Sequence, residues 1–194
     1  QTWMLVPNPL GVLPFAGIGG LAVAVITIFA KRAAFVTAPL YAICEGLSLG
    51  AISVVTDSLY PGIAAEAVGL TLAVFASLLV LYRTRVVQPS ENLKLGVMAG
   101  TMGLCLYYMA SFVAGFWGIS LPLIHDTGIL GIGFSLFVIV LAALNLVLDF
   151  DFIEQGVAAR APRHMEWYAA FGLVVTLVWL YVEILNLLVK LRRD

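Results

Sequence analysis

Two acidic side chains inside long apolar stretches are the residues best placed to do chemistry in this sequence. Glu183 lies in the apolar run 177–191, and Asp149 ends another apolar run. An acid at bilayer depth is costly and faces the interior of a helix bundle, so it is a functional-site candidate by default. Asn186 follows Glu183 by one helical turn and Asn145 precedes Asp149 by one turn, so each carboxyl group has an amide on its own helix face. We therefore interpret the two asparagines as supporting residues.

The chain between these acids predicts a helical hairpin. A turn is expected at Ala161-Pro162-Arg163, with a helix on either side. An antiparallel hairpin can bring Asp149 and Glu183 within direct or single-water hydrogen-bonding reach. Two simpler interpretations stay open: Asp149 as an acid in the lipid headgroup region, and Glu183 as a lone protonated acid within the bundle.

Other ionisable residues are less specific. Glu45 sits near the middle of an apolar run, and a functional role and a structural role are equally open for it. Glu66 is expected at a helix N-terminus, where the helix dipole favours an anion, so we interpret it as structural. Asp151 is expected to be solvated. His125 and His164 fall in predicted loops and are interpreted as solvated rather than as ligands.

The composition indicates which elements must position these acids. Of 194 residues, 62% are hydrophobic and 11% are charged, whereas a soluble domain has about 45–50% and about 25%. Apolar runs without strict alternation, each long enough to cross about 30 Å of hydrocarbon, predict transmembrane helices. The predicted spans are Leu13–Ala30, Ala33–Thr56, Gly62–Tyr82, Leu95–Trp117, Gly128–Leu148 and Trp167–Val189.

These spans predict an all-α, polytopic integral membrane bundle that forms one transmembrane domain over residues 1–194. Residues 1–12 are interpreted as the tail of an earlier helix and a loop. With a net charge of −1, no basic face points to nucleic acid. Cys44 and Cys105 are interpreted as small apolar residues, and the pairs Gly46/Gly50 and Gly96/Gly100 predict close helix contacts.

The basic residues predict the orientation. The turns at 31–32, 83–94 and 160–163 carry Lys and Arg, whereas those at 57–61 and 120–127 carry neither. The positive-inside rule places the first three in the cytoplasm. Lys190, Arg192 and Arg193 break the pattern, so the last segment either crosses fully, which we favour, or is short or re-entrant.

The segment 144–153 around Asp149 and the segment 180–188 around Glu183 together resemble the Bax inhibitor family, more specifically its bacterial YccA-like branch. The segment 39–50, which contains Glu45, fits the third helix of that branch. The resemblance is spread over residues 13–190 and implies seven helices, six of them packed around the last, with the first lying upstream of this sequence. One departure is that the second acid of the family is usually Asp, and here it is Glu183.

The resemblance implies a pH-sensitive calcium leak controlled by the two acids. Two carboxylates in a poorly hydrated space cannot both ionise cheaply and tend to share a proton. Loss of that proton creates either repulsion between helices or an anionic oxygen site that suits Ca²⁺. Asp149 and Glu183 are then the candidate Ca²⁺ ligands, no other cofactor is expected, and Lys31 or Arg32 is a candidate latch for the second acid. The expected partners are the lipid bilayer, calcium and protons, in a bacterial plasma membrane.

Two other classes of function occur among polytopic membrane proteins. The first is an interaction protein that modulates another membrane complex such as a membrane protease, as YccA-like members are thought to do. The second is an intramembrane protease. The aspartyl type requires a Gly-x-Gly-Asp element, which this sequence lacks. The serine type requires a His within a span, whereas both His residues fall in predicted loops. We therefore do not expect an enzyme.

Overall fold

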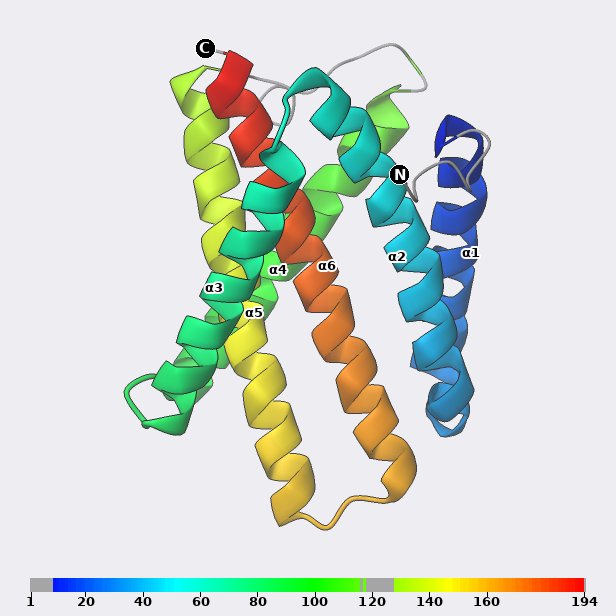
Figure 1. The fold of residues 1–194 in the computed structure, drawn as a ribbon. Helices are drawn as coiled ribbons and strands as arrows, with labels where there is room; N and C mark the ends of the chain where they lie inside the picture. Colours follow the sequence, from blue (N-terminus) through cyan, green and yellow to red (C-terminus); the bar gives the residue numbers. More distant parts are fainter. Residues whose placement is uncertain (1–8, 116, 118–127, 194) are drawn as a thin grey trace.

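All regular secondary structure in the described part of the chain is helical (Figure 1). The computed structural model describes residues 9–115, 117 and 128–193, with side chains from Ala16 onward. The helices are α1 (Pro9–Phe29), α2 (Ala34–Leu59), α3 (Ile63–Arg83), α4 (Glu91–Gly115), α5 (Ile129–Ala158) and α6 (Arg163–Arg193), with a short 3₁₀ helix, η2 (Lys31–Ala33), between the first two.

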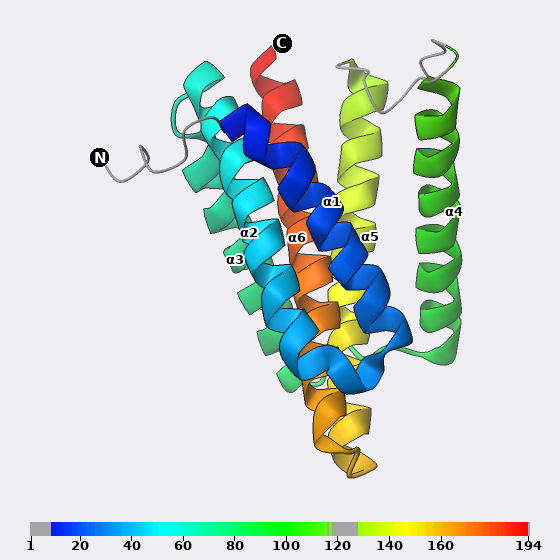
Figure 2. The ribbon, with the colours of Figure 1, turned by 90° about the vertical axis from the view of Figure 1, so that its right-hand side faces the viewer.

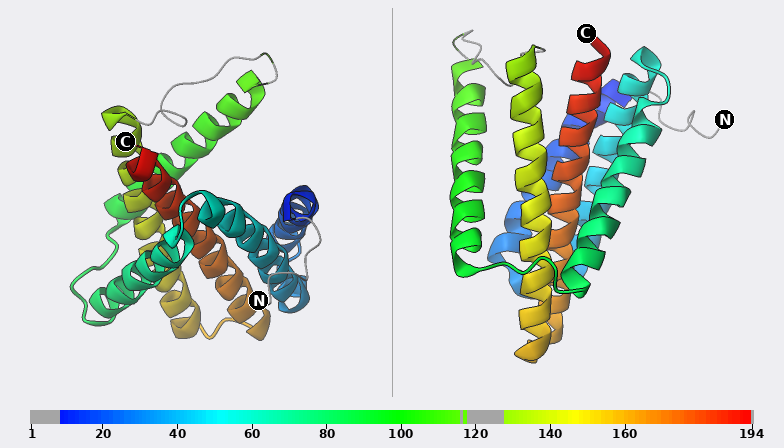
Figure 3. Two further views of the ribbon diagram at one scale, coloured as in Figure 1. Left: turned by 45° about the horizontal axis from the view of Figure 1, so that its top comes forward. Right: turned by 90° about the vertical axis from the view of Figure 1, so that its left-hand side faces the viewer.

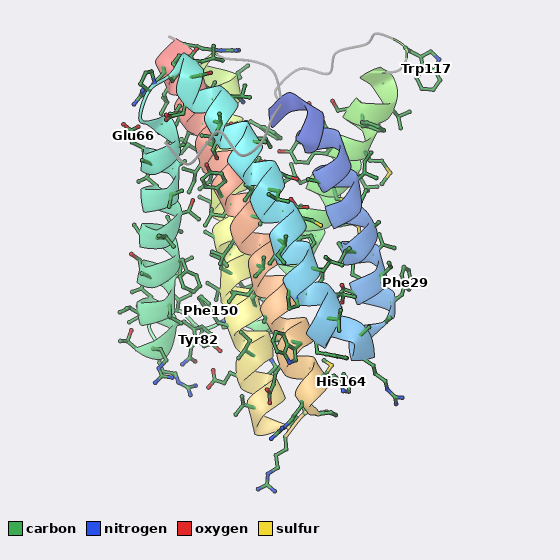
Figure 4. The ribbon with its side chains drawn as sticks, turned by 45° about the vertical axis from the view of Figure 1, so that its right-hand side comes forward. Phe29, Glu66, Tyr82, Trp117, Phe150 and His164 are labelled. Carbon is green, nitrogen blue, oxygen red and sulfur yellow. The ribbon has the colours of Figure 1, made fainter. Side chains whose placement is uncertain are left out.

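The outer surface of the molecule is apolar. Five helices, α2 to α6, are long and apolar enough to cross a membrane, and α1 has 21 residues. Large hydrophobic side chains point outward: Phe29 is 86% exposed and Ile129 is 89% exposed, and Figure 4 shows Phe29 directed away from the bundle. Because water does not stabilise such a surface and lipid does, the structure confirms a polytopic membrane bundle.

The last helix is central, as the family resemblance implied. Helix α6 packs against α2, α3, α5 and η2, whereas α1 packs on α2 and α4 on α5 (Figures 1 and 2). Figure 3 shows α4 at the edge of the bundle. The core around α6 includes Leu180 and Ile184 of α6, Leu146 of α5, and Ile63 and Ala67 of α3. Side chains on α6 therefore meet several neighbouring helices.

Several helices extend beyond the predicted membrane spans. Helix α1 begins at Pro9 rather than Leu13, because proline is tolerated where the first N–H groups of a helix have no partner anyway. Helix α4 begins at Glu91, and α5 continues past Leu148 to Ala158. Helices α5 and α6 therefore extend beyond the other helices at one end (Figure 1). Hydropathy marks where a helix leaves the lipid, and it does not mark where the helix ends.

The α2–α3 turn is closed by a carboxylate and a glycine. Gly62 has φ 87°, a left-handed conformation that glycine adopts without a steric cost. Asp57 Oδ1 accepts hydrogen bonds from the N–H groups of Gly62 (2.9 Å) and Ala64 (3.4 Å). These bonds satisfy backbone groups that the start of α3 leaves without intrahelical partners.

The predicted topology agrees with the arrangement of the helices. The turns after α1, α3 and α5 lie at one end of the bundle, and the C-terminus lies at the other (Figure 1). Figure 4 shows Tyr82 and His164 toward the first end and Glu66 toward the second. The predicted outer loop at 120–127, with His125 and Asp126, lies outside the described residues.

The C-terminal cations have local partners. Helix α6 runs the full depth of the bundle, so the re-entrant alternative is wrong. Arg192 Nη2 lies 2.7 Å from Glu66 Oε1, and Nη1 donates to the Pro61 carbonyl at 3.1 Å. This ion pair offsets part of the positive charge at the C-terminal end of the bundle.

Of the four glycines predicted to allow close helix contacts, one does so. A Cβ atom added to Gly100 would lie 3.1 Å from Leu141 Cδ1 of α5. Cβ atoms added to Gly46, Gly50 or Gly96 would have nothing within 4 Å. Small residues allow helices to approach only where a neighbouring helix faces them, and the sequence spacing does not specify that.

Candidate functional site

Asp149 faces α6. A Cβ atom on Gly172 would lie 3.7 Å from Asp149 Oδ1, and the Asp149 carboxyl group is hydrogen-bonded to the Thr176 side chain. Oδ2 of Asp149 is buried and has no hydrogen-bond partner among the described residues. This position favours an interior acid over one dissolved in the headgroup region.

Glu183 is buried in the bundle with partners of its own. Its side chain is 6% exposed, and its Oε1 accepts a hydrogen bond from the Tyr108 hydroxyl of α4 at 2.8 Å. A side-chain hydrogen bond from Trp179, one turn earlier on α6, also reaches the carboxyl group, and Lys190 interacts with it electrostatically. Glu183 is therefore a partnered acid and not a lone one.

The structure does not bring the two acids into hydrogen-bonding contact. Asp149 lies level with Gly172 and Thr176, and Glu183 lies seven residues beyond Thr176, which corresponds to about 10.5 Å of helix rise. In the part of the chain that the structure describes, no hydrogen bond joins the two carboxyl groups. The predicted dyad is therefore absent from this state.

The reason is the register of the hairpin. Nine residues of α5 (150–158) lie between Asp149 and the end of its helix, whereas twenty residues of α6 (163–182) precede Glu183. In an antiparallel hairpin, residues at the same level are separated from the turn by similar numbers of residues. Counting nine residues forward from the start of α6 (163–171) reaches Gly172, which is the residue that Asp149 faces.

The two predicted supporting amides have other roles. Asn145 Nδ2 donates to Thr101 Oγ1 of α4 at 2.8 Å and to the Leu141 carbonyl at 2.9 Å, so it joins α5 to α4. Asn186 is exposed and makes no hydrogen bond to Glu183 among the described residues. Among the described residues neither amide therefore bonds the acid on its own helix, because residues one turn apart share a helix face without having to bond each other.

Glu45 packs against α1. A Cβ atom on Gly20 would lie 2.6 Å from Glu45 Oε1, so the absence of a side chain on Gly20 makes room for this carboxyl group. The candidate latch residues contact neither Asp149 nor Glu183 in the described structure. Lys31 Nζ lies 5.1 Å from the centre of the Tyr168 ring on α6, and Arg32 is exposed.

Sequence reasoning missed a buried lysine. Lys190 is 8% exposed, and its Nζ donates to the Gly131 carbonyl at 3.1 Å and to Ser135 Oγ at 3.0 Å, both on α5. The sequence interpretation counted Lys190 only as a charge at the chain end. Its spacing from Glu183 was the signal available.

Three buried polar side chains follow each other along α6 at intervals of seven residues: Thr176, Glu183 and Lys190. An interval of seven returns to nearly the same face of a helix, with a drift of about 20°. Thr176 bonds Asp149, Glu183 bonds Tyr108, and Lys190 bonds Ser135. We call Thr176, Glu183 and Lys190 the polar seam of α6.

A second polar cluster lies at the opposite end of the bundle from the C-terminus. Lys94 forms ion pairs with Asp151 (2.9 Å) and Glu91 (3.1 Å), and Arg85 pairs with Glu154 at 3.0 Å. The prediction that Asp151 is simply solvated was wrong, because its side chain is 20% exposed and paired. These pairs tie the ends of α3 and α4 to α5. Within the described residues, no three His, Cys, Asp or Glu side chains are grouped so as to hold a metal ion.

Comparison with known proteins gives one match. The family model described as Bax inhibitor 1 like matches residues 1–193. No curated protein and no solved structure matches the chain.

Proposed function

The chain belongs to the Bax inhibitor 1 like family, and from this premise we propose that it is a pH-sensitive leak for cations, with calcium as the main cargo, in a bacterial plasma membrane. The observation that carries the proposal is the presence of two acids, Asp149 on α5 and Glu183 on α6, inside a bundle whose core is mainly apolar. Ionisable residues in such positions mark ion pathways and proton relays in membrane proteins.

The chemistry of the two carboxyl groups supports both parts of the proposal. A protonated carboxyl group is neutral and can stay among apolar helices with a single hydroxyl partner. When the proton leaves, the negative charge needs water or a cation, because the apolar surroundings do not solvate it. Carboxylate oxygens are ligands that Ca²⁺ takes readily. Proton and calcium would therefore compete for the same oxygens, which links pH to the leak.

The structure favours two control points over one shared proton. Asp149 bonds Thr176, whereas Glu183 bonds Tyr108 about two helical turns away. Loss of either proton would weaken a different contact, the one between α5 and α6 or the one between α4 and α6. Opening at both levels would give a continuous path along the polar seam.

The test is calcium flux into lipid vesicles that contain only this protein, measured over a range of pH. Because the two acids have separate partners, Asp149→Asn and Glu183→Gln should each keep part of the pH dependence, and the double variant should lose it. Glu91→Gln is the matched control, since Glu91 is an acid whose side chain is 85% exposed. Absence of flux with the unaltered protein, or an unchanged pH profile in the double variant, contradicts the proposal. Loss of the whole pH dependence in either single variant would instead support the hypothesis that the two acids share one proton.

A second candidate function is the modulation of another membrane complex, such as a membrane protease. The observation that favours it is the α5–α6 hairpin, which extends past the other helices (Figure 1). A pocket of about 630 Å³ lies on this hairpin, with Ile153, Val157, Met165 and Leu173 among its lining residues. The vesicle experiment separates the two candidates, because a pure modulator conducts nothing when it is alone in the membrane. No catalytic role is proposed.

A further inference from the structure

We propose that the groove between α3 and α5 binds an anionic phospholipid, whose phosphate is held by Arg83 and Arg85 while an acyl chain lies in the groove. The inference goes beyond the proposed leak and does not depend on it. It assigns a ligand to a cavity whose lining includes neither of the two intramembrane acids.

The groove is a mainly apolar cavity of about 640 Å³, which falls in the range of about 300–1,000 Å³ that is typical of ligand pockets. Its apolar lining comes from three helices: Phe75 and Leu79 of α3, Phe150, Ile153 and Val157 of α5, and Leu173 of α6. The ring of Phe150 lies 5.7 Å from that of Phe75 and 5.7 Å from that of Tyr82, which Figure 4 shows beside it. Such a lining suits an acyl chain.

Two arginines also line the groove, at the point where α3 leaves the apolar region. The predicted span ends at Tyr82, and Arg83 follows it directly, which places its charge near the lipid headgroups. Arg83 is exposed and has no ion-pair partner among the described residues. Arg85 uses Nη2 for Glu154, which leaves other N–H groups of its guanidinium for a second acceptor. Guanidinium groups bind phosphate well, and basic pockets at the cytoplasmic side of membrane helices bind anionic headgroups.

A smaller hollow adjoins the groove. Its volume is about 220 Å³, and it shares Tyr82, Arg85 and Glu154 with the groove. Gln88 and Asp151 are among its other lining residues, so this hollow is more polar than the groove. The two cavities together are apolar on one side of Arg85 and polar on the other. A phospholipid has the same division into acyl chain, phosphate and polar headgroup, whereas a free phosphate would occupy only the middle of this arrangement.

The experiment measures thermal unfolding of the full chain in detergent micelles, with phosphatidylglycerol as the anionic probe. A ligand of the folded state at tenfold excess over its dissociation constant raises the unfolding temperature by about 3–6 °C, and phosphatidylglycerol should give this shift. Phosphatidylcholine has no net charge, so at the same concentration it should give a shift of about 1 °C at most. Inorganic phosphate at that concentration should give none.

Four variants test the parts of the site. Arg83→Gln should weaken lipid binding roughly 10-fold and reduce the shift to about 1 °C, because a hydrogen bond to a charged group is lost. Arg163→Gln is the matched control, since Arg163 is exposed at the same end of the bundle and lies outside the groove. Glu154→Gln removes a carboxylate from the lining and should increase the shift. Leu79→Trp fills the groove and should abolish the shift while both arginines remain.

Several results would overturn the inference. They are the absence of a shift in the unaltered protein, equal shifts with the two phospholipids, and a full shift in Arg83→Gln. An equal shift with inorganic phosphate would assign the arginines to a free anion and not to a lipid. If Leu79→Trp does not fold, Val157→Trp provides the second filling variant, because Val157 lines the groove and is 75% exposed. A full shift in a folded filling variant would show that no acyl chain occupies the groove.

Discussion

The hydroxyl groups that meet the two acids differ in the hydrogens they can offer. Thr176 has one hydroxyl hydrogen and also lies 3.2 Å from the Gly172 carbonyl, to which it donates. The Gly172 carbonyl and the Asp149 carboxyl group therefore compete for this one hydrogen. Tyr108 instead donates to Oε1 of Glu183, a bond that strengthens when the carboxyl group is ionised. The contact at Asp149 and the contact at Glu183 should therefore respond differently to the loss of a proton.

Tyr108→Phe tests the contact between α4 and Glu183 by removing a single oxygen atom. The substitution removes the hydroxyl group that donates to Glu183 and keeps the ring. A hydrogen bond to a charged group contributes about 1.5–3 kcal/mol, so ionised Glu183 should lose that much stabilisation. The flux–pH curve measured in vesicles should therefore shift along the pH axis toward higher pH, because ionisation becomes harder.

Tyr181→Phe is the matched control for this prediction. Tyr181 is buried on the same central helix, and its hydroxyl lies 2.6 Å from Ser53 Oγ of α2, away from either acid. Its loss should lower thermal stability without moving the flux–pH curve. If both variants shift the curve equally, the hydroxyl of Tyr108 has no specific role at Glu183.

At the scale of the elements, α3 and α5 are each followed by an arginine with an unusual backbone conformation. Arg85 follows α3 with φ 62° and Arg160 follows α5 with φ 49°, the left-handed conformation that usually selects glycine. Backbone bonds from Val86 N to Leu81 O (3.0 Å) and from Ala161 N to Gly156 O (2.9 Å) close the two turns. The turn after α5 sets the register of the hairpin, so it determines which residue of α6 faces Asp149.

Arg160→Gly should stabilise the protein. A left-handed conformation costs an L-residue about 1–2 kcal/mol, and the greater freedom of glycine in the unfolded chain returns part of this, so the expected net gain is about 0.5–1 kcal/mol. Thermal unfolding in detergent micelles measures it. Arg85→Gly should be nearly neutral, because it also removes an exposed ion pair with Glu154, a kind of contact that contributes about 0–1 kcal/mol. A lower unfolding temperature for Arg160→Gly would contradict the interpretation of the turn.

At the scale of the whole molecule, the number and order of the helices could be predicted from the sequence because the thickness of a bilayer sets the length of each apolar run. The central position of α6 was implied by the family resemblance. The ends of α4 and α5 could not be predicted from hydropathy, because a helix continues in water until a turn residue such as Arg160 stops it.

The two acids were identified from the sequence, whereas their relative height in the bundle was not. Buried charge in an apolar run identifies Asp149 and Glu183, but their relative height depends on where the hairpin turns, at residues 159–162. Counting residues from that turn would have placed Asp149 opposite Gly172. Lys190 was overlooked because a lysine near a chain end was interpreted only as a topology signal. The seven-residue spacing from Thr176 through Glu183 identifies it as part of the seam.

The orientation of the whole bundle can be tested with two cysteine variants. Arg85 and Ser58 are exposed and lie at opposite ends of the bundle, after α3 and near the end of α2. With Cys44 and Cys105 replaced by alanine, a membrane-impermeant thiol reagent added to intact cells should label Ser58→Cys and miss Arg85→Cys. The reason is that the basic turns share the end that carries Arg85, and positively charged turns stay in the cytoplasm. Labelling of Arg85→Cys after the membrane is permeabilised provides the control for reactivity. The reverse pattern would place the C-terminal end of α6 in the cytoplasm and contradict the predicted orientation.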